Sequence, residues 1–302
     1  MRPPYNLQNA WRGLARGWQE FFHGAIDARG PALVRIAYAT VLLVNLADWY
    51  PNLLLWFGER GLLPAEAAQR INDPAGWSLL AWLPADDATL RLCYAAFVVQ
   101  TVCLLLGVLT RFSAVAVFVW LVSFQSRNSL IWDGEDTVFR LLACYLIFMP
   151  CGAAWSADAW LRRWLWPANS VAATGPRQVS AWGLRLVQIQ MCLIFFSAGL
   201  CKLQGEVWVD GKALFYIAQL DEFGKYPLPV GMFQTPWLVR AMTWSVIVVE
   251  LVAPLLVWFR ETRRASLLVV LVFHLANEYS MHLFLFHWVM LAGWLASVLP
   301  DD

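Results

Sequence analysis

Short polar breaks divide most of this chain into long apolar stretches. A helix needs about 20 apolar residues to cross the hydrocarbon core of a bilayer. Stretches of roughly that length cover residues 32–57, 88–109, 112–126, 137–154, 182–203 and 236–259. A further stretch, residues 265–300, is long enough to cross twice, with a tight turn expected at the polar run 277–280. The pattern predicts an all-α, polytopic membrane bundle of about eight transmembrane helices.

The segment before the first span has a different pattern. Its apolar residues recur at helical spacing between basic ones: Trp11, Leu14, Trp18, Phe21, Phe22 and Ile26. This spacing predicts an amphipathic helix on the cytoplasmic membrane surface, with a partner-docking helix as the alternative. We do not expect a cleavable signal peptide, because no short apolar core with a small-residue cleavage site follows Arg2. The expected organisation is an N-terminal amphipathic segment, residues 1–31, and a transmembrane bundle, residues 32–300.

Basic residues are distributed unevenly between the loops on the two sides of these spans. Eleven fall on the side of the N-terminus: Arg2, Arg12, Arg16, Arg29, Arg111, Arg162, Arg163, Arg177, Arg260, Arg263 and Arg264. Five fall on the other side: Arg60, Arg70, Arg127, Lys212 and Lys225. Loops rich in arginine and lysine stay in the cytoplasm. The asymmetry therefore predicts a cell-membrane protein with both termini in the cytoplasm and its acidic loops outside.

Composition narrows the class of protein further. Of the 302 residues, 60% are apolar and only 14% are charged, which excludes an ordinary soluble enzyme. The net charge of +1 provides no basic field for nucleic acid. The six cysteines form no Cys-x-x-Cys pair, so we expect free thiols, with an interhelical disulfide or a redox role as alternatives. A linker is expected at residues 167–176, and residues 204–235 are expected to fold back onto the bilayer or the bundle mouth.

Polar residues within or beside the spans are the candidates for chemistry, because charges in a membrane are costly. A dense outer cluster contains Arg127, Asp133, Glu135, Asp136 and Arg140. A solvated hairpin and a substrate-binding cluster are equally good interpretations of it. Arg140 favours the second interpretation, because it points into an apolar helix and needs an anion or a carbonyl nearby.

The second half of the chain contains further candidates. Lys202 either snorkels to the interface or acts as a base or anion anchor. His274, Glu278 and His282 follow a spacing of four, with Asn277 between them and His287 beyond. We expect hydrogen bonds within the bundle or a ligand-bonding, proton-handling role there, and no metal, because nothing completes a ligand set. The charges inside the spans, Arg35, Asp48 and Glu250, are expected to be paired structurally.

Several short motifs together resemble the HTTM (horizontally transferred transmembrane) proteins, whose membrane module is shared with vitamin K-dependent γ-glutamyl carboxylases. The matching pieces are Gly61-Leu62-Leu63-Pro64, Phe148-Met149, Trp155-Ser156-x-Asp158, Gln188, Ala198-Gly199-x-x-Lys202-Leu203, Trp208, Gly211, His274-Leu275-x-Asn277 and Val289-Met290-Leu291-Ala292. Their order and spacing, rather than any one piece, carry the resemblance.

The resemblance implies a reduced quinone, of menaquinol or vitamin K type, as cofactor and a peptide or lipid at the outer face as substrate. In the family's eukaryotic carboxylases a lysine base begins the run Lys-Thr-Ser-Trp-Asn-Asn-His. Alignment without gaps places Trp132 on the tryptophan of that run, Ser129 on the lysine and Glu135 on the histidine. Arg127 cannot replace the lysine base, because a guanidinium does not deprotonate.

On this basis we assign roles to ten residues. Catalytic roles go to Lys202, His274 and Glu135, cofactor contacts to Gln188, Trp132 and Asn277, and substrate contacts to Arg127, Asp133, Asp136 and Arg140. If quinol chemistry is retained, Lys202, helped by His274, is expected to stabilise the quinol anion. The competing class is a non-catalytic membrane partner in the maturation or immunity of an exported peptide. A transporter would need paired broken helices, which the pattern does not show.

The asymmetry of basic residues leads to a prediction about orientation. Cysteine probes at Asp73 and Asp221 should react with an impermeant reagent added from outside the cell. Probes at Gly175 and Thr262 should react only after permeabilisation. Labelling of Gly175 from outside would overturn the orientation.

Overall fold

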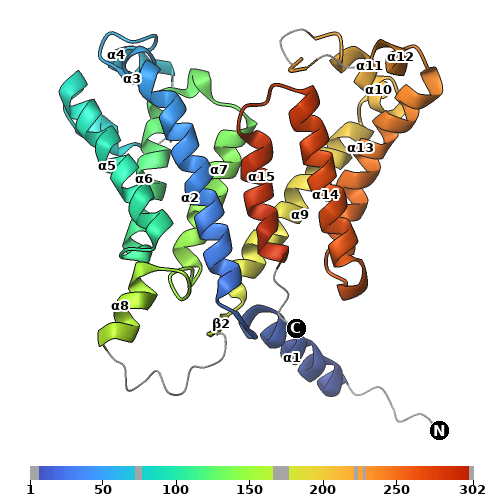
Figure 1. The fold of residues 1–302 in the computed structure, drawn as a ribbon, viewed down its shortest axis with the longest axis horizontal. Coiled ribbons are helices and arrows are strands. Elements are labelled where there is room, and N and C mark those ends of the chain that lie inside the picture. Colours follow the sequence, from blue (N-terminus) through green and yellow to red (C-terminus); the bar gives the residue numbers. More distant parts are fainter. Residues whose placement is uncertain (1–6, 72–76, 166–176, 221–223, 227–228, 299–302) are drawn as a thin grey trace. The chain divides into compact units, whose positions relative to one another are not determined.

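The structure is a computed structural model in which residues 7–71, 77–165, 177–220, 224–226 and 229–298 are described. Helices make up most of this described chain, in agreement with the all-α prediction (Figure 1). The chain forms two compact units, one comprising the described residues up to Val187 and the other Gln188–Val298. The expected linker at residues 167–176 lies outside the described residues, and the boundary between the units falls within helix α9 (Trp182–Leu203).

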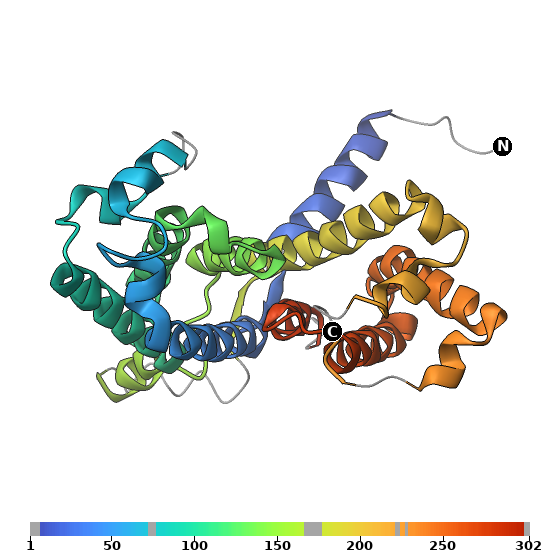
Figure 2. The same ribbon diagram turned by 90° about the horizontal axis from the view of Figure 1, so that it is seen from above.

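The first unit is built around four helices, which Figure 2 shows nearly end-on. They are α2 (Arg29–Trp49), α5 (Asp87–Leu106), α6 (Thr110–Arg127) and α7 (Gly134–Phe148). Helix α2 contacts α5 and α7, and α6 contacts α5 and α7, so the four enclose one core. Aromatic rings fill that core at the end where the short helix α3 (Leu53–Phe57) follows α2. The Phe124 ring stacks on Phe97 at 5.8 Å and meets Phe57 edge-on at 5.4 Å.

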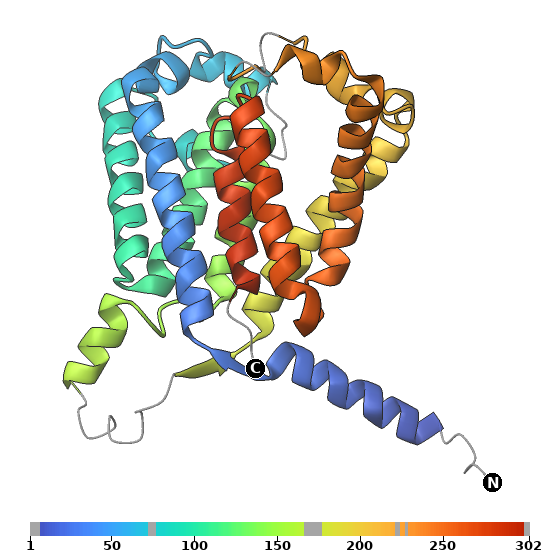
Figure 3. The ribbon, with the colours of Figure 1, turned by 45° about the vertical axis from the view of Figure 1, so that its right-hand side comes forward.

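At the other end of this unit, α1 (Leu7–His23) runs at a large angle to α2 (Figure 3). Trp11, Leu14 and Trp18 are exposed along it, so the predicted amphipathic helix is present. A short antiparallel ribbon follows, in which β1 (Ala25–Asp27) pairs with β2 (Gln178–Ser180). The ribbon joins the start of α2 to the start of α9. Sequence pattern did not predict it, because three-residue strands are too short to show alternation.

The family motif Trp155-Ser156-x-Asp158 fastens helix ends in this region. Asp158, in α8 (Ala157–Leu165), accepts hydrogen bonds from the backbone N–H groups of Leu109 and Thr110 at 2.8 and 2.7 Å. It therefore caps the start of α6, where backbone donors have no helical partner. Ser156 Oγ accepts a bond from the backbone N–H of Ala159 at 3.0 Å, at the start of α8.

Arg35 completes the same junction. The side chain is fully buried, and its guanidinium donates to the carbonyl oxygens of Cys151 at 3.0 Å and Trp155 at 2.5 Å. Gly107 ends α5 with a φ of 69°, and a Cβ there would lie 2.4 Å from Arg35 Nη1. Only glycine allows this backbone conformation and this close approach. The expected structural pairing of Arg35 is therefore made by its two Nη atoms with carbonyl groups rather than with a carboxylate, while its Nε has no partner among the described residues.

The second unit is built from α9, α13 (Pro236–Leu256), α14 (Arg260–Ser280) and α15 (Phe286–Trp294). Helix α14 contacts both α13 and α15. The segment 204–235 forms three short helices, α10 (Glu206–Val209), α11 (Ala213–Ile217) and α12 (Val230–Phe233), and each contacts α13. All six cysteines of the chain lie in described segments and are free thiols.

Within the described residues, four helices are long and apolar enough to cross a membrane. They cover Arg29–Phe57, Asp87–Leu106, Trp182–Leu203 and Pro236–Leu256. Helix α7 has 15 residues and α15 has nine, so each is shorter than the roughly 20 residues that a hydrocarbon core requires. The chain is a helical membrane protein, and the count of about eight crossings stays a prediction.

The stretch 265–300 forms two helices with a turn between them, as predicted, but the turn comes later than expected. Helix α14 continues through residues 277–280, and the break before α15 lies at residues 281–285. Ser280 Oγ donates to the carbonyl oxygen of Ala276 at 2.9 Å, so its hydroxyl is satisfied by the helix itself. The helix ends at Met281, which is extended and bridges to Gly224. His282 consequently lies beyond α14 rather than on the helical face of His274 and Glu278.

The Asp158 cap predicts a stability difference that depends on pH. Burial alone would raise the pKa of this carboxyl, but the hydrogen bonds from Thr110 and Leu109 outweigh it and hold that pKa below its ordinary value. The charged form therefore stabilises the fold above the unfolded pKa, and the contribution is lost as pH falls through the folded pKa. Asp158→Asn should cost about 1 kcal/mol at neutral pH, because both carboxylate oxygens accept hydrogen bonds and the amide NH2 of asparagine cannot accept one.

The measurement is thermal unfolding of the detergent-solubilised protein at neutral pH and below about pH 4. The difference between Asp158→Asn and the parent should shrink at the lower pH. Glu20→Gln, at an exposed position of α1, serves as the control and should match the parent. A difference that does not change with pH would contradict this account of the cap.

Candidate functional site

The ten residues assigned roles from the sequence are divided between the two units. Those in the first unit are Arg127, Trp132, Asp133, Glu135, Asp136 and Arg140. Those in the second unit are Gln188, Lys202, His274 and Asn277. The sequence also predicts that the outer-face residues Arg127, Asp133, Glu135 and Asp136 converge with Lys202 and His274 at the outer end of one cavity, and this stays a prediction.

In the first unit, Gln125 at the end of α6 is the centre of the polar cluster. Its side-chain N–H donates to the carbonyl and carboxylate oxygens of Asp136, each at 3.0 Å. Arg140 Nε donates to Gln125 Oε1 at 2.9 Å, and Trp132 Nε1 donates to the Gln125 carbonyl at 2.5 Å. The Arg140 guanidinium also lies over the Trp132 ring, 4.6 Å from its centroid. The polar partner that Arg140 requires is therefore Gln125, a residue that the sequence pattern did not identify as a candidate.

Asp133 and Asp136 also cap α7. Asp133 accepts a hydrogen bond from the backbone N–H of Glu135 at 2.9 Å, and Asp136 accepts one from the backbone N–H of Asp133 at 3.1 Å. This reciprocal capping box satisfies donors at the helix N-terminus. Glu135 itself is buried beside it, with 6% of its surface exposed. Both aspartates therefore have a structural role whether or not they bind a substrate.

Arg127 is engaged by the chain that follows α3. Its guanidinium donates to the carbonyl oxygens of Leu63 at 2.8 Å and Gly58 at 3.2 Å. Asn128 donates to the carbonyl oxygen of Trp56 at 2.8 Å, and a short turn, Ser129–Ile131, follows it. The arginine thus positions the segment that contains the family motif at residues 61–64.

In the second unit, Lys202 is held by a carboxylate. Its Nζ donates to both carboxylate oxygens of Glu250, at 2.7 and 2.9 Å, and lies 5.2 Å from the Trp208 ring centroid. Gly199 lets α9 and α13 approach, because a Cβ there would lie 2.8 Å from the Leu251 side chain. The sequence expectation that Glu250 is paired is confirmed, and its partner is the lysine expected to be catalytic.

The other candidates of this unit have separate partners. Gln188 donates to the carbonyl oxygen of Ala296 at 2.7 Å. It precedes Lys202 by fourteen residues on α9, which corresponds to about 21 Å along the helix axis. The two side chains therefore cannot bond the same small ring. His274 faces His287 of α15, with their Nδ1 atoms 3.1 Å apart.

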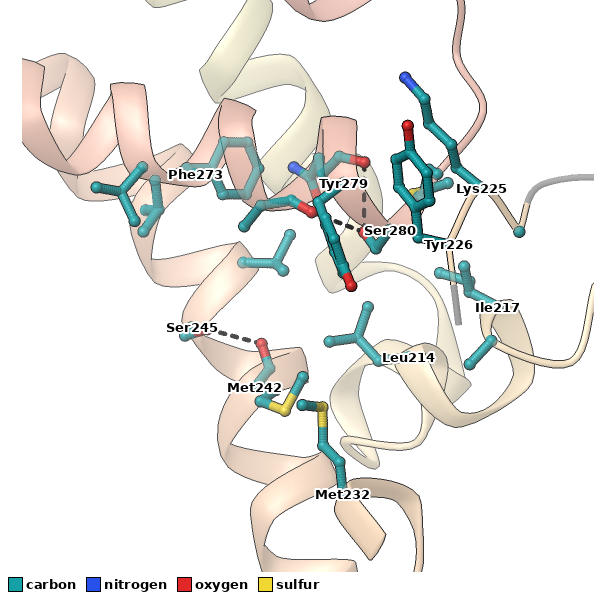
Figure 4. Close-up of a pocket in the computed structure, with 18 of the residues that line it drawn as sticks. Leu214, Ile217, Lys225, Tyr226, Met232, Met242, Ser245, Phe273, Tyr279 and Ser280 are labelled. Atoms are coloured by element: carbon teal, nitrogen blue, oxygen red, sulfur yellow. Dashed lines mark hydrogen bonds between the residues drawn. The ribbon is translucent and has the colours of Figure 1, made fainter. Parts of the chain in front are cut away.

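An apolar cavity of about 1220 Å³ lies in the second unit among α11, α12, α13 and α14 (Figure 4). Apolar side chains supply most of its walls, including Leu214, Ile217, Met232, Met242, Val246, Val249, Val272 and Phe273. The polar residues on its lining are Lys225, Tyr226, Ser245, Asn277, Tyr279 and Ser280. Of the ten residues that were assigned roles from the sequence, Asn277 alone lines this cavity. Most of the other lining residues lie on apolar helix faces, which the sequence pattern does not distinguish from ordinary core.

One end of this cavity is organised by the loop before α12. Lys225 donates to Glu278 Oε1 at 2.5 Å, and Tyr226 stacks on Tyr279 with ring centroids 5.2 Å apart. Figure 4 shows the Tyr279 ring reaching into the cavity, with Lys225 at its margin. The hydrogen bond to Glu278 raises the pKa of Lys225 above its ordinary value, so the ammonium stays charged at neutral pH. Lys225 can therefore anchor an anion but cannot act as a base.

Among the described residues, no group of three or more His, Cys, Asp or Glu side chains is arranged to hold a metal ion. His274 is also absent from the cavity lining, because Val269, Val272, Phe273 and Ala276 present the opposite side of α14. The second unit therefore offers two distinct features, an apolar cavity and a buried histidine pair.

The buried ion pair leads to a prediction about stability. Lys202→Met leaves the Glu250 carboxylate buried without its cation, which typically costs about 3–5 kcal/mol. The double variant Lys202→Met/Glu250→Gln should recover most of that loss, because no charge is then unpaired. Resistance to thermal unfolding in detergent measures both. As a control, Lys212→Met removes a solvent-exposed partner of Asp210 and should leave stability unchanged. Equal stability of Lys202→Met and the parent would exclude a structural ion pair between Lys202 and Glu250.

Comparison with known proteins agrees with the sequence motifs. A protein of Bacillus subtilis (strain 168), described as the uncharacterized protein YitO, is 27% identical over 145 residues, which are 44% of this chain and 43% of that protein. The chain thus matches less than half the length of that relative. No solved structure matches. The family model described as the HTTM domain matches residues 27–301, nearly the whole chain, and the protein therefore belongs to the HTTM domain family.

Proposed function

We propose that this membrane protein binds a reduced quinone in the cavity of its second unit and uses it to modify a peptide or lipid at the outer face of the membrane. The apolar cavity of about 1220 Å³ is the observation that carries the proposal. A quinone has a flat ring with two oxygens and an apolar tail. It needs mainly apolar walls with a few polar groups that orient the ring.

The polar residues of the cavity suit the ring of such a ligand. The Asn277 amide and the Tyr279 hydroxyl can each donate to, or accept from, a ring oxygen. The Lys225 ammonium, held by Glu278, favours negative charge that develops on an oxygen near it. A bound quinol would supply reducing equivalents for a reaction with oxygen.

Lys225 takes the place in this proposal that sequence reasoning gave to Lys202. Lys202 does not line the cavity, and its Nζ is bonded to both carboxylate oxygens of Glu250 and lies over the Trp208 ring. Lys225 lies on the lining and is paired with one carboxylate oxygen of Glu278. A cation in this position binds and orients the ligand, and the base that accepts the quinol proton must be another group.

A non-catalytic role as a membrane partner in peptide maturation or immunity is the second candidate. It is favoured by the structural engagement of Arg127, Asp136 and Lys202, each of which has partners within its own unit. Residues whose polar atoms are already bonded contribute to a fold without turning over a substrate. The two functions differ in whether a quinol bound in the cavity is oxidised.

The test is extraction of quinones from protein purified in mild detergent, with detection by mass spectrometry. The parent should retain quinone, and Ala276→Trp, which fills the cavity from α14, should lose most of it. Ala265→Trp adds the same ring to the same helix outside the cavity lining and should retain quinone like the parent. Absence of quinone from the parent, or equal retention by both variants, would refute quinone binding.

Activity is tested separately, with the parent reconstituted in lipid and supplied with a reduced quinone. Quinol-dependent oxygen consumption should be present in the parent and Ala265→Trp and absent in Ala276→Trp. Lys225→Met should lower it, because the variant loses the cation beside the ring. A parent that binds quinone without consuming oxygen would support the partner role instead.

A further inference from the structure

Four buried polar atoms of the second unit have no hydrogen-bond partner among the described residues. They are His274 Nε2, His287 Nε2, Glu278 Oε2 and Trp294 Nε1. His274 and His287 are only 1% and 2% exposed. Leaving a buried donor or acceptor unsatisfied costs about 1–3 kcal/mol each. Such a concentration of unsatisfied atoms within one small unit points to a function.

The histidine pair has a defined pattern of donors and acceptors. With the two Nδ1 atoms 3.1 Å apart, one ring must carry the proton at Nδ1 and donate it to the other. In the neutral pair the second ring then carries its own proton at Nε2. One outer Nε2 is therefore a donor and the other an acceptor, and the pair is open to proton exchange at both ends.

Glu278 provides an acceptor on the same side. It lies four residues after His274 on α14, hence on the same helical face. Lys225 occupies its Oε1, while Oε2 is unsatisfied. Glu278 and Lys225 both act electrostatically on His287, and their side chains are 16% and 27% exposed. Glu278 thus connects the histidine pair to the accessible end of the unit.

The other neighbours of the pair cannot transfer a proton. Phe195 of α9 lies 5.7 Å from the His274 ring, Phe273 lies 5.5 Å from it, and Phe286 lies 5.5 Å from His287. Trp294 packs on Phe195 at 5.0 Å, and its indole N–H is a donor only. Among the described residues, Glu278 and Lys225 are the other titratable groups that act electrostatically on the pair.

We propose that His274, His287 and Glu278 form a proton-transfer site that carries protons between the buried interior of the second unit and the accessible end of α14. In one step, an acidic O–H donor in the interior, a hydronium ion or a ligand hydroxyl, gives a proton to His274 Nε2. The Nδ1 proton of His274 then crosses to His287 Nδ1. His287 Nε2 then releases its proton to Glu278 Oε2 through a bridging water. One proton enters and one leaves, and the two rings exchange tautomers. The proposal does not depend on quinone binding, because His274 does not line the cavity.

The first test determines the tautomers. The chain has four histidines, and His23→Gln with His282→Gln leaves only the pair. Nitrogen-15 NMR of this protein in lipid nanodiscs should show one ring protonated at Nδ1 and one at Nε2, with coupling across the Nδ1–H···Nδ1 bond. Two rings in the same tautomer, or no coupling, would overturn the shared proton.

The second test separates transfer from structure. Exchange of the shared proton with solvent should slow about tenfold or more in Glu278→Gln, since positioned acid–base groups typically contribute about 10²–10⁴-fold. The tautomers should remain as in the parent, which shows that the pair is intact. Glu261→Gln, an exposed position at the other end of α14, should exchange like the parent. Glu278→Asp keeps a carboxylate, so its shared proton should exchange faster than that of Glu278→Gln. Equal exchange rates in these two variants would refute the transfer role. Parent-like exchange in Glu278→Gln would refute it as well.

Discussion

Polar groups within an apolar helix bundle must find partners inside the protein, because the hydrocarbon core offers no water to satisfy them. The arrangement of both units follows from this constraint. Arg35 is fully buried and bonds two backbone carbonyls, and Lys202 is bonded to both oxygens of Glu250. Each of these contacts joins segments that are far apart in the chain. The same contacts therefore stabilise a buried charge and hold the helices of the bundle together.

The family motifs acquire physical meaning from the same constraint. Asp158 and Ser156 cap two helices at one end of the first unit, while Arg127 holds the segment at residues 61–64 through carbonyl groups. In the second unit, Gly199 gives Glu250 and Lys202 the space to meet. These residues specify how helices join. Their place in this chain is therefore explained by architecture before any chemistry is invoked.

Buried polar atoms that lack a partner inside the protein are therefore candidates for a function. Most polar candidates have partners, whereas the outer nitrogens of His274 and His287 and one oxygen of Glu278 have none in the part of the chain that the structure describes. The apolar cavity lies on the other side of α14, with Lys225 and Tyr279 on its lining. A site for an apolar ligand and a site for protons are thus supported by one helix. Helix α14 provides both because its opposite faces carry different residues.

Sequence alone determined the helical membrane class, the amphipathic α1 and the family, because each depends on local periodicity, composition or short motifs. Tertiary structure decided which polar residues meet: Glu250 lies 48 residues from Lys202, and Gln125 lies 15 residues from Arg140. It also decided that α14 runs to Ser280, where helical hydrogen bonds satisfy residues that resemble a turn, and that apolar faces of α13 and α14 enclose a cavity. Periodicity reports which face of a helix is apolar, but the partner of that face, or of a buried charge, depends on contacts between distant segments.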